Sequence, residues 1–178
     1  MKNVPVTVSL QSDPVMQLAF ICNPLPTPQC HASTIAETSE GMVAAWFGGT
    51  RERDPDVGIW LARQEGGTWL PARKVVNGVQ ADGNRFPCWN PVLHAARDGS
   101  LVLFYKVGPD CTWWWGGKMV SCDGGRTWSV PTRLPNGMIG PIKNKPLTLP
   151  DGRVLCGAST EFGPWLTHVE TTDDAAAV

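Results

Sequence analysis

The sequence lacks the features that mark helical, membrane-spanning and nucleic-acid-binding proteins. Its 178 residues hold 15 lysines and arginines against 16 aspartates and glutamates, and no block of basic residues occurs. No window of about a dozen residues keeps a helical apolar stripe that is free of glycine or proline. No apolar run approaches the ~20 residues that a membrane span needs. We therefore expect an all-β chain whose partner is neither a nucleic acid nor a membrane.

Cysteine is present but shows no pairing or metal-binding pattern. The six cysteines are scattered along the chain, and none forms a C-x-x-C motif. We therefore predict reduced, partly buried thiols, with no metal site and no other cofactor. The first 13 residues lack the long apolar core and the small-residue cleavage site of a secretory signal. These observations together predict a cytoplasmic protein.

Glycine, proline and tryptophan are abundant, with 19, 16 and 9 residues, and aromatic content otherwise comes mainly from five phenylalanines against one tyrosine. Residues 121–128 read SCDGGRTW and match every defined position of the pattern Ser-x-Asp-x-Gly-x-Thr-Trp. A degenerate copy at 62–69 reads ARQEGGTW, and a third copy would begin at Thr171. Three copies at similar spacing indicate a repeat protein.

Each copy belongs to a unit of four short strand-like runs. An acidic-Gly or Asp-Gly pair, typical of a two-residue hairpin turn, joins the first two runs of each unit at 40–41, 98–99 and 151–152. A unit of about 50 residues with four strands has the size of a propeller blade. We therefore predict a β-propeller with about three four-stranded blades present. The predicted segments are an extended N-terminal region at 1–27 and blades at about 28–76, 86–135 and 142–178.

The order of strands A to D in a blade separates two rims. In an up-and-down sheet the A–B and C–D turns lie on one rim, and the B–C loops and the connections between blades lie on the other. The Asp-Gly turns and the repeated motifs therefore share the first rim, which we call the box rim. We predict that Asp123 accepts backbone N–H groups of its own turn there and takes no part in chemistry. The second rim, which we call the loop rim, is the candidate site.

The loop rim gathers cations able to hold an anionic ligand and carboxylates able to move a proton. An arginine binds a carboxylate through two hydrogen bonds, and a carboxyl group whose pKa is raised by burial can act as a general acid. With a period of two, Trp113 and Trp115 would face one side of a strand and either fill the core or stack on a sugar ring. The predicted substrate-binding residues are Arg51, Arg53, Arg85, Asn90, Lys106, Trp113, Lys143, Asn144, Lys145 and Glu161.

The repeated motif and the segment HASTIAETSEGMVAAWFGGTRERDPDVGIWLARQEGGTW resemble the first blade of the sialidase (neuraminidase) superfamily, whose signature is the Asp box or BNR repeat. The strings GGTRE, WNPVL, YKVGP and GPIKNKP are most similar to a bacterial exo-α-sialidase subgroup. The resemblance implies a six-bladed propeller, of which this chain would be the N-terminal half. It also implies a glycoside hydrolase that releases terminal sialic acids from glycoconjugates.

The same resemblance suggests roles for individual residues. Sialidases bind the sugar carboxylate with an arginine triad, use an aspartate as acid/base, and use a Tyr-Glu pair as nucleophile. Arg51 matches the arginine that follows the second strand, and Asp54 or Glu52, in the same loop, matches the acid/base. Asp56 matches a position that is more often structural. His31 stands where the first triad arginine is expected, and the remaining triad arginines and the Tyr-Glu pair would lie in further blades.

Two other functions stay open at this point. A lyase or hydrolase directed at uronic acids could use His31 as its base or acid and the same basic residues for the uronate carboxylate. A non-catalytic glycan-binding module is the third possibility. In each case the partner is a glycan or an anionic sugar, and association through open blade edges is an additional expectation.

Overall fold

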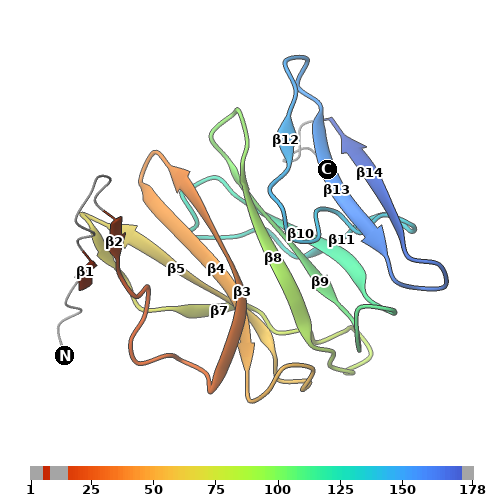
Figure 1. Cartoon of the computed structure of the whole chain (residues 1–178), viewed down its shortest axis with the longest axis horizontal. Coiled ribbons are helices and arrows are strands. Elements are labelled where there is room, and N and C mark those ends of the chain that lie inside the picture. Colours follow the sequence, from red (N-terminus) through yellow and green to blue (C-terminus); the bar gives the residue numbers. More distant parts are fainter. Residues whose placement is uncertain (1–5, 9–15, 174–178) are drawn as a thin grey trace.

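The computed structural model describes residues 6–8 and 16–173, and in these residues every regular element is a β-strand. The strands form three antiparallel sheets that follow one another from left to right in Figure 1, with a small additional sheet at the N-terminal end. This arrangement confirms the all-β prediction. Within the described residues no helix is long and apolar enough to cross a membrane.

Blade one contains the strands that the first repeat predicts, with one irregularity at its outer edge. Strands β3, β4 and β5 pair in sequence order, and β5 then pairs with both β6 and β7. The bounds are β3 Gln29–Thr38, β4 Gly41–Gly49, β5 Gly58–Glu65, β6 Thr68–Trp69 and β7 Arg73–Val76. The fourth strand is therefore divided into two short pieces.

Blades two and three repeat the same up-and-down order. Blade two pairs as β8-β9-β10-β11, and blade three as β12-β13-β14. The bounds in blade two are β8 Cys88–Ala95, β9 Leu101–Val107, β10 Trp115–Ser121 and β11 Thr132–Arg133. Those in blade three are β12 Leu147–Thr148, β13 Val154–Thr160 and β14 Leu166–Thr172. Most of the third motif copy, and any fourth strand of blade three, lies outside the described residues.

The N-terminal segment forms a hairpin of its own and covers blade one. Strands β1 (Val6–Val8) and β2 (Met16–Leu18) pair antiparallel with each other, at the end of the array opposite to blade three in Figure 1. Farther along, Ile21 and Cys22 pack on the outer face of blade one, against a small cluster that contains Trp46. Strands β1 and β2 are the regular elements among the described residues of the predicted segment 1–27.

The A–B turns have the backbone conformation that their sequences require. Gly41, Gly99 and Gly152 have φ angles of +124°, +87° and +96°, in the region that favours glycine. At Gly41 a Cβ atom would lie 2.3 Å from the carbonyl oxygen of Gln64, so this turn also admits no side chain. The hairpins occur where they are predicted, but each glycine follows the two central turn residues: Gly41 pairs with Thr38, and the N–H groups of Gly99 and Gly152 donate to the carbonyls of Ala96 and Leu149.

Aliphatic side chains from the strands make the packing between blades. Val43 and Leu61 of blade one share one fully buried cluster with Leu103 of blade two. A second cluster joins Val102 of blade two to Val154 of blade three. The core therefore lies between the sheets, and this stacking turns the ends of all strands toward two common rims.

Candidate functional site

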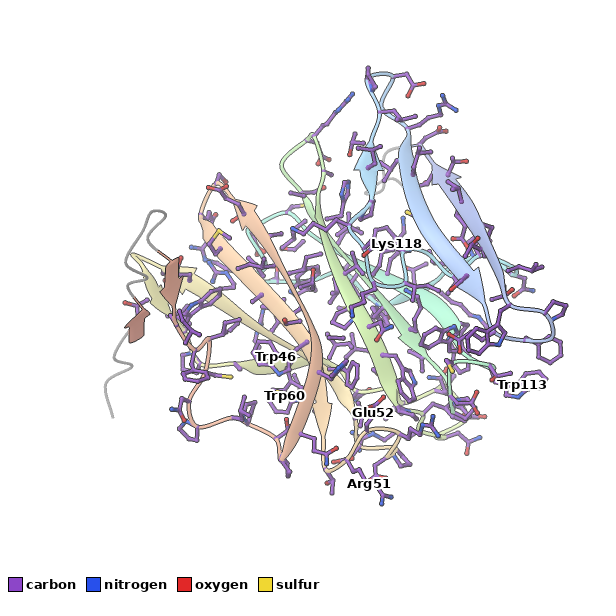
Figure 2. The ribbon with its side chains drawn as sticks, in the orientation of Figure 1. Trp46, Arg51, Glu52, Trp60, Trp113 and Lys118 are labelled. Atoms are coloured by element: carbon purple, nitrogen blue, oxygen red, sulfur yellow. The ribbon has the colours of Figure 1, made fainter. Side chains whose placement is uncertain are left out.

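The two rims of the array differ in chemistry as well as in chain topology. In Figure 1 the A–B turns lie at the upper ends of the sheets, and the B–C loops lie at the lower ends. Figure 2 shows Arg51, Glu52 and Trp113 at this lower side, which is the loop rim.

The box turn of blade two is closed by its own polar side chains. Asp123 accepts hydrogen bonds from the Thr127 N–H at 2.8 Å and from the Ser121 hydroxyl at 2.8 Å. The Thr127 hydroxyl also donates to this carboxylate, at 2.6 Å. The hydroxyl and N–H of Thr127 and the hydroxyl of Ser121 lower the pKa of Asp123 to about 2. These contacts support the structural role that the sequence predicts for Asp123.

Arginines of blade one bind this turn from the neighbouring sheet. Arg63 Nε donates to the carbonyl of Gly124 at 2.8 Å, and Arg73 donates to the carbonyl of Gly125 at 2.7 Å. Arg63 also pairs with Glu65 at 2.9 Å, and Arg126 of the box pairs with Glu40 of the first A–B turn. The box rim is therefore a network of paired charges that joins blades one and two.

The degenerate motif copy in blade one folds differently from the intact box. The prediction that it forms the same turn in degenerate form is therefore wrong. Glu65 pairs directly with Thr68 in a tight hairpin, and the Leu70 N–H donates to the Arg63 carbonyl. In the intact box the corresponding bond joins Ser129 to Val120, across a longer turn. Without the serine and aspartate side chains, the chain forms the two-residue hairpin that a Gly-Gly pair favours.

The loop between β4 and β5 carries the predicted acid/base candidates and is internally ordered. Arg51 forms an ion pair with Asp54 at 3.1 Å, with the two side chains 72% and 28% exposed. The backbone N–H of Glu52 donates to the side chain of Gln29 at 3.0 Å, which attaches the loop to β3. Arg53 is exposed and has a positive φ of +77°. The loop therefore holds four charged residues, 51–54, in a defined turn.

Asp56 closes the base of this loop. Its carboxylate accepts the backbone N–H and the hydroxyl of Thr50, each at 2.9 Å. Burial raises the pKa of Asp56. The hydrogen bonds from Thr50 and the charges of Lys74 and Arg85 together outweigh this effect, so the net shift of the pKa is downward. These contacts agree with the structural role that the resemblance implies for this position.

His31 and Glu52, two of the predicted catalytic residues, line the same groove. This groove has a volume of about 360 Å³ and lies between the start of β3 and the β4–β5 loop. Gln29 and Phe47 also line it, and the His31 ring lies 5.6 Å from the Phe47 ring. Asp54, by contrast, faces Arg51 and is not part of the groove wall. The structure thus separates two acid/base candidates that the sequence left equivalent.

The innermost strands of blades one and two are distorted at equivalent places beside the loop rim. A register shift interrupts β3 between His31 and Thr34, and another interrupts β8 between Trp89 and Val92. Ala32 and Asn90 lie inside these bulges with positive φ angles of +53° and +37°. Bulges and strained residues of this kind are common next to active sites, where they redirect side chains. Asn90 is therefore in a strand, although the sequence placed it in a connection.

Two predicted cations are held by backbone carbonyl groups. Arg85 Nε donates to the Asn77 carbonyl at 2.9 Å, and Arg85 Nη2 donates to the Asp56 carbonyl at 3.1 Å. Lys145, in the connection from blade two to blade three, donates to the Ile35 carbonyl of β3. Both side chains therefore link segments of the protein to each other. Lys143 and Asn144 are exposed in the same connection as Lys145.

Lys106 does not lie on the loop rim, which corrects the prediction that it binds substrate. Its side chain is fully buried in β9, and Nζ donates to the Pro141 carbonyl at 2.6 Å. Burial lowers the pKa of Lys106 to about 7, although Glu170 opposes this shift. The lysine belongs to the packing between blades two and three, where Glu170 also accepts the N–H groups of Ile139 and Gly140.

Aromatic rings form an arc along the loop rim that the sequence only partly predicts. Phe47 contacts Trp89 with ring centroids 6.0 Å apart, and Trp89 contacts Trp114 at 6.2 Å. Trp113 contacts Phe162 of blade three at 4.6 Å. Because β10 begins only at Trp115, the prediction that Trp113 and Trp115 share one face of a strand is wrong.

Phe162 is not predicted from the sequence, because only the charged Glu161 is selected there from the loop STEFGPW. The signal that could have found it is a pair of aromatic residues in a glycine- and proline-containing loop. Glu161 of the same loop lies against blade two. Its hydrogen bond with Cys111, together with burial, raises the pKa of that thiol.

The described residues contain no group of three or more His, Cys, Asp or Glu side chains that could hold a metal ion. All six cysteines are free thiols. Cys88 and Cys156 are buried, and burial raises their pKa values to about 12 and about 11.

Comparison with solved structures places this array among known propellers. It is similar to the Hadza microbial sialidase, with a TM-score of 0.60 and 15% identity over 75% of this chain and 32% of the other. It is also similar to Trypanosoma rangeli sialidase in complex with sialic acid, with a TM-score of 0.56 and 13% identity over 99% of this chain and 32% of the other. A family 117 glycoside hydrolase from Zobellia galactanivorans is similar with a TM-score of 0.57 and 13% identity over 82% of this chain and 53% of the other.

These similarities show the shared fold, and the chain spans about one third to one half of the length of those structures. No curated protein matches the sequence. The sequence model of the BNR repeat-like domain, however, matches residues 40–178, which is most of the chain. The resemblance that the repeated motifs suggest is thereby confirmed, and the chain belongs to the BNR repeat-like domain family of sialidase-type β-propellers.

Proposed function

We propose that the loop rim forms part of a glycoside hydrolase site that releases terminal sialic acid, or a related anionic sugar, from glycoconjugates. The observation that carries this proposal is the groove of about 360 Å³ that His31 and Glu52 line together. Support comes from the family, and from sialidases and another glycoside hydrolase with the same fold. The activity, the sugar and the linkage are all part of the proposal.

Glu52 is the residue best placed to act as general acid. Glu52 belongs to the groove wall, whereas Asp54 is held in an ion pair with Arg51 and does not line the groove. A carboxylic acid beside the glycosidic oxygen donates a proton to the leaving group as the bond to the anomeric carbon breaks. Asp54 is the second candidate, and its ion pair with Arg51 would position the guanidinium group.

The cations of the rim would hold the negative charge of the sugar. Arg51 is largely exposed, so its planar guanidinium group is available for a carboxylate. Lys143 is also exposed, in the connection to blade three. Arg85 and Lys145 donate to backbone carbonyl groups, so we assign them a supporting role.

The nucleophile is not supplied by a tyrosine of this chain. The one tyrosine, Tyr105, is 3% exposed in the core between blades one and two. Burial raises the pKa of its phenol, which disfavours the reactive phenolate. A Tyr-Glu pair of the kind that the resemblance implies would have to approach the groove from elements outside those described.

The proposal is tested by replacing the two carboxyl groups separately. We expect Glu52→Gln to lower the turnover of a fluorogenic sialoside by about 100-fold or more, the usual contribution of a general acid. Asp54→Asn should have a smaller effect, through the position of Arg51. Glu37→Gln, at the opposite end of β3, is the matched control and should leave turnover unchanged. Unchanged rates in both Glu52→Gln and Asp54→Asn would rule out this assignment.

A uronate-directed enzyme is the second candidate, because His31 holds the place of the first triad arginine. An imidazole beside an anionic sugar ring suits proton abstraction next to a carboxylate. The products separate the two reactions, because a lyase leaves an unsaturated ring that absorbs ultraviolet light and a hydrolase does not. Binding of sialosides or uronides without turnover of either would instead indicate a glycan-binding module.

A further inference from the structure

Two cysteines lie on the outer face of blade one. The chain between β2 and β3 runs along the side of blade one that faces away from blade two (Figure 1), and Cys22 packs there against the cluster around Trp46. Cys30, at the start of β3, pairs with Gly48 of β4. A Cβ atom at Gly48 would lie 3.5 Å from the Cys30 Cβ atom. Because Trp46 and Gly48 are two residues apart on one strand, both thiols stand on the same face of β4.

A small cavity brings the two thiols into one space. Cys22, Cys30 and Trp46 all line it, and its volume is about 290 Å³. Burial, and after it the charge of the Cys30 thiolate, raises the pKa of Cys22. A charge has this effect only on a group that is near it. The two cysteines are therefore neighbours, although both are free thiols in this structure.

The segment that carries Cys22 can adjust its position relative to β3. Residues 19–28 form neither a strand nor a helix, and seven residues separate Cys22 from Cys30. A disulfide bond requires two Cα atoms within about 7 Å of each other. Because Cys22 lies in this irregular segment, it can approach Cys30 without breaking the hydrogen bonds of the sheet.

We propose that Cys22 and Cys30 are a dithiol that a soluble disulfide, such as oxidised glutathione, converts into a disulfide bond on the outer face of blade one. The Cys30 thiolate attacks one sulfur of oxidised glutathione, which forms a mixed disulfide and releases one glutathione. The Cys22 thiolate then attacks the Cys30 sulfur, which forms the bridge and releases the second glutathione. Each departing glutathione takes up the proton that a cysteine has lost, so two protein thiols are oxidised and one glutathione disulfide is reduced.

The environments of the two cysteines determine which of them reacts first. Cys30 is exposed, so a disulfide in solution reaches its sulfur atom, whereas Cys22 is half-buried. Only the thiolate is nucleophilic, and the raised pKa of Cys22 disfavours its thiolate in the free protein. Cys30 is therefore the thiol that oxidised glutathione modifies, and Cys22 is the thiol that resolves the mixed disulfide.

The bridge would fasten the N-terminal segment beside the groove. Leu25, Gln29 and Cys30 belong to the groove wall together with Glu52. The Gln29 side chain also accepts the N–H of Glu52 at 3.0 Å. A bond between Cys30 and Cys22 would close residues 22–30 into a ring and restrict the movement of this wall.

Tryptic mass mapping of the whole chain after incubation with oxidised glutathione tests the proposal. Trypsin cleaves after lysine and arginine, so residues 3–51 form one peptide, which contains Cys22, Cys30 and no other cysteine. We expect this peptide to lose the mass of two hydrogens and to regain it with a reductant. In Cys22→Ser the peptide should instead carry one glutathione on Cys30. Cys122→Ser removes an exposed cysteine of the box turn and, as the matched control, should form the bridge as the wild type does.

The melting temperature measures whether the bridge fastens the segment. The bridged wild type should melt about 5 °C above the reduced protein, and Cys22→Ser and Cys30→Ser should show no such rise. Cys22→Ala serves in place of Cys22→Ser if a hydroxyl group at this half-buried position prevents folding.

The wild type alone is enough to overturn the proposal. Glutathione retained on Cys30 without the loss of two hydrogens would overturn it, and so would a 3–51 peptide that stays unmodified in excess oxidised glutathione. A bridge that leaves the melting temperature unchanged would overturn the claim that it fastens the segment. None of these measurements uses a sugar, so the inference stands or falls separately from the proposed function.

Discussion

The two rims are the opposite ends of the same strands, yet they use charge in opposite ways. At the box rim, Arg63 and Arg126 are paired with glutamates, and Asp123 is saturated by its own turn. At the loop rim, Arg51 is largely exposed and Lys143 is exposed in a connection. The comparison teaches that charge at the box rim joins sheets together, whereas at the loop rim Arg85 and Lys145 link segments but Arg51 and Lys143 remain exposed to a ligand.

The two rims also differ in which residues have positive φ angles. At the box rim the positive φ angles fall on glycines of the turns, such as Gly99 and Gly125, where they cost little. Beside the loop rim they fall on Ala32 and Asn90, and also on Arg53. Such conformations in residues with side chains are unfavourable by about 1 kcal/mol or more each. The fold thus accepts strain where the proposed site lies.

The largest loss of stability at neutral pH is expected at the box rim, from Arg63→Ala. The side chain is 10% exposed and makes contacts with Glu65, Glu40 and the Gly124 carbonyl. Removing it takes the donor from the Gly124 carbonyl and one cation from two partly exposed glutamates that still pair with Arg126, so the loss should be about 1–2 kcal/mol. Urea denaturation should show this loss. Arg53→Ala is the matched control, and an equal loss of stability in that variant would contradict the comparison.

Lys106 sharpens the comparison, because this lysine stands near the end of β9 that leads to the loop rim, yet it is buried and binds a backbone carbonyl. Burial lowers its pKa to about 7 from 10.5, so the folded protein binds fewer protons than the unfolded chain between these values. Stability should therefore rise with pH across this window. Lys106→Met should remove this rise, which amounts to at most about 4 kcal/mol between pH 7 and pH 10.

Melting temperatures measured at pH 6 and pH 10 for the wild type and Lys106→Met test this prediction. The variant should gain stability relative to the wild type at pH 6, provided that the Pro141 carbonyl and Glu170 tolerate the loss of their partner. Lys143→Met controls for the removal of an exposed lysine and should keep the wild-type pH dependence. A parallel pH dependence in the wild type and Lys106→Met would show that Lys106 keeps an ordinary pKa.

Much of this fold follows from local sequence, because its turns are chemically explicit. The Glu40-Gly41 and Asp98-Gly99 pairs fix two hairpins, and the box sequence fixes the turn around Asp123. Side-chain alternation was less informative in β9, all of whose residues are buried. A strand covered on both faces has no polar side to mark its end, so Lys106 was assigned to the loop that follows.

The candidate site could be predicted only as a set of residues on one rim. The contact between Trp113 and Phe162, and the separation of Glu52 from Asp54, depend on how loops from different segments fold against each other. Sequence spacing within one loop carries no information on these distances. Arg85 shows the same limit, since its carbonyl partners come from two other segments.

The smallest effect on stability is expected from Arg51→Ala, because this side chain is the most exposed of the arginines compared here. An ion pair with an arginine that is 72% exposed contributes less than about 1 kcal/mol. Under the proposed function, the affinity for free sialic acid should nevertheless fall about tenfold. Arg51→Lys should recover only part of this loss, because a lysine keeps the charge but not the planar fork that matches a carboxylate. If Arg51→Ala instead destabilised the fold as much as Arg63→Ala, the loop rim would be structural too, and the division of labour between the rims would fail.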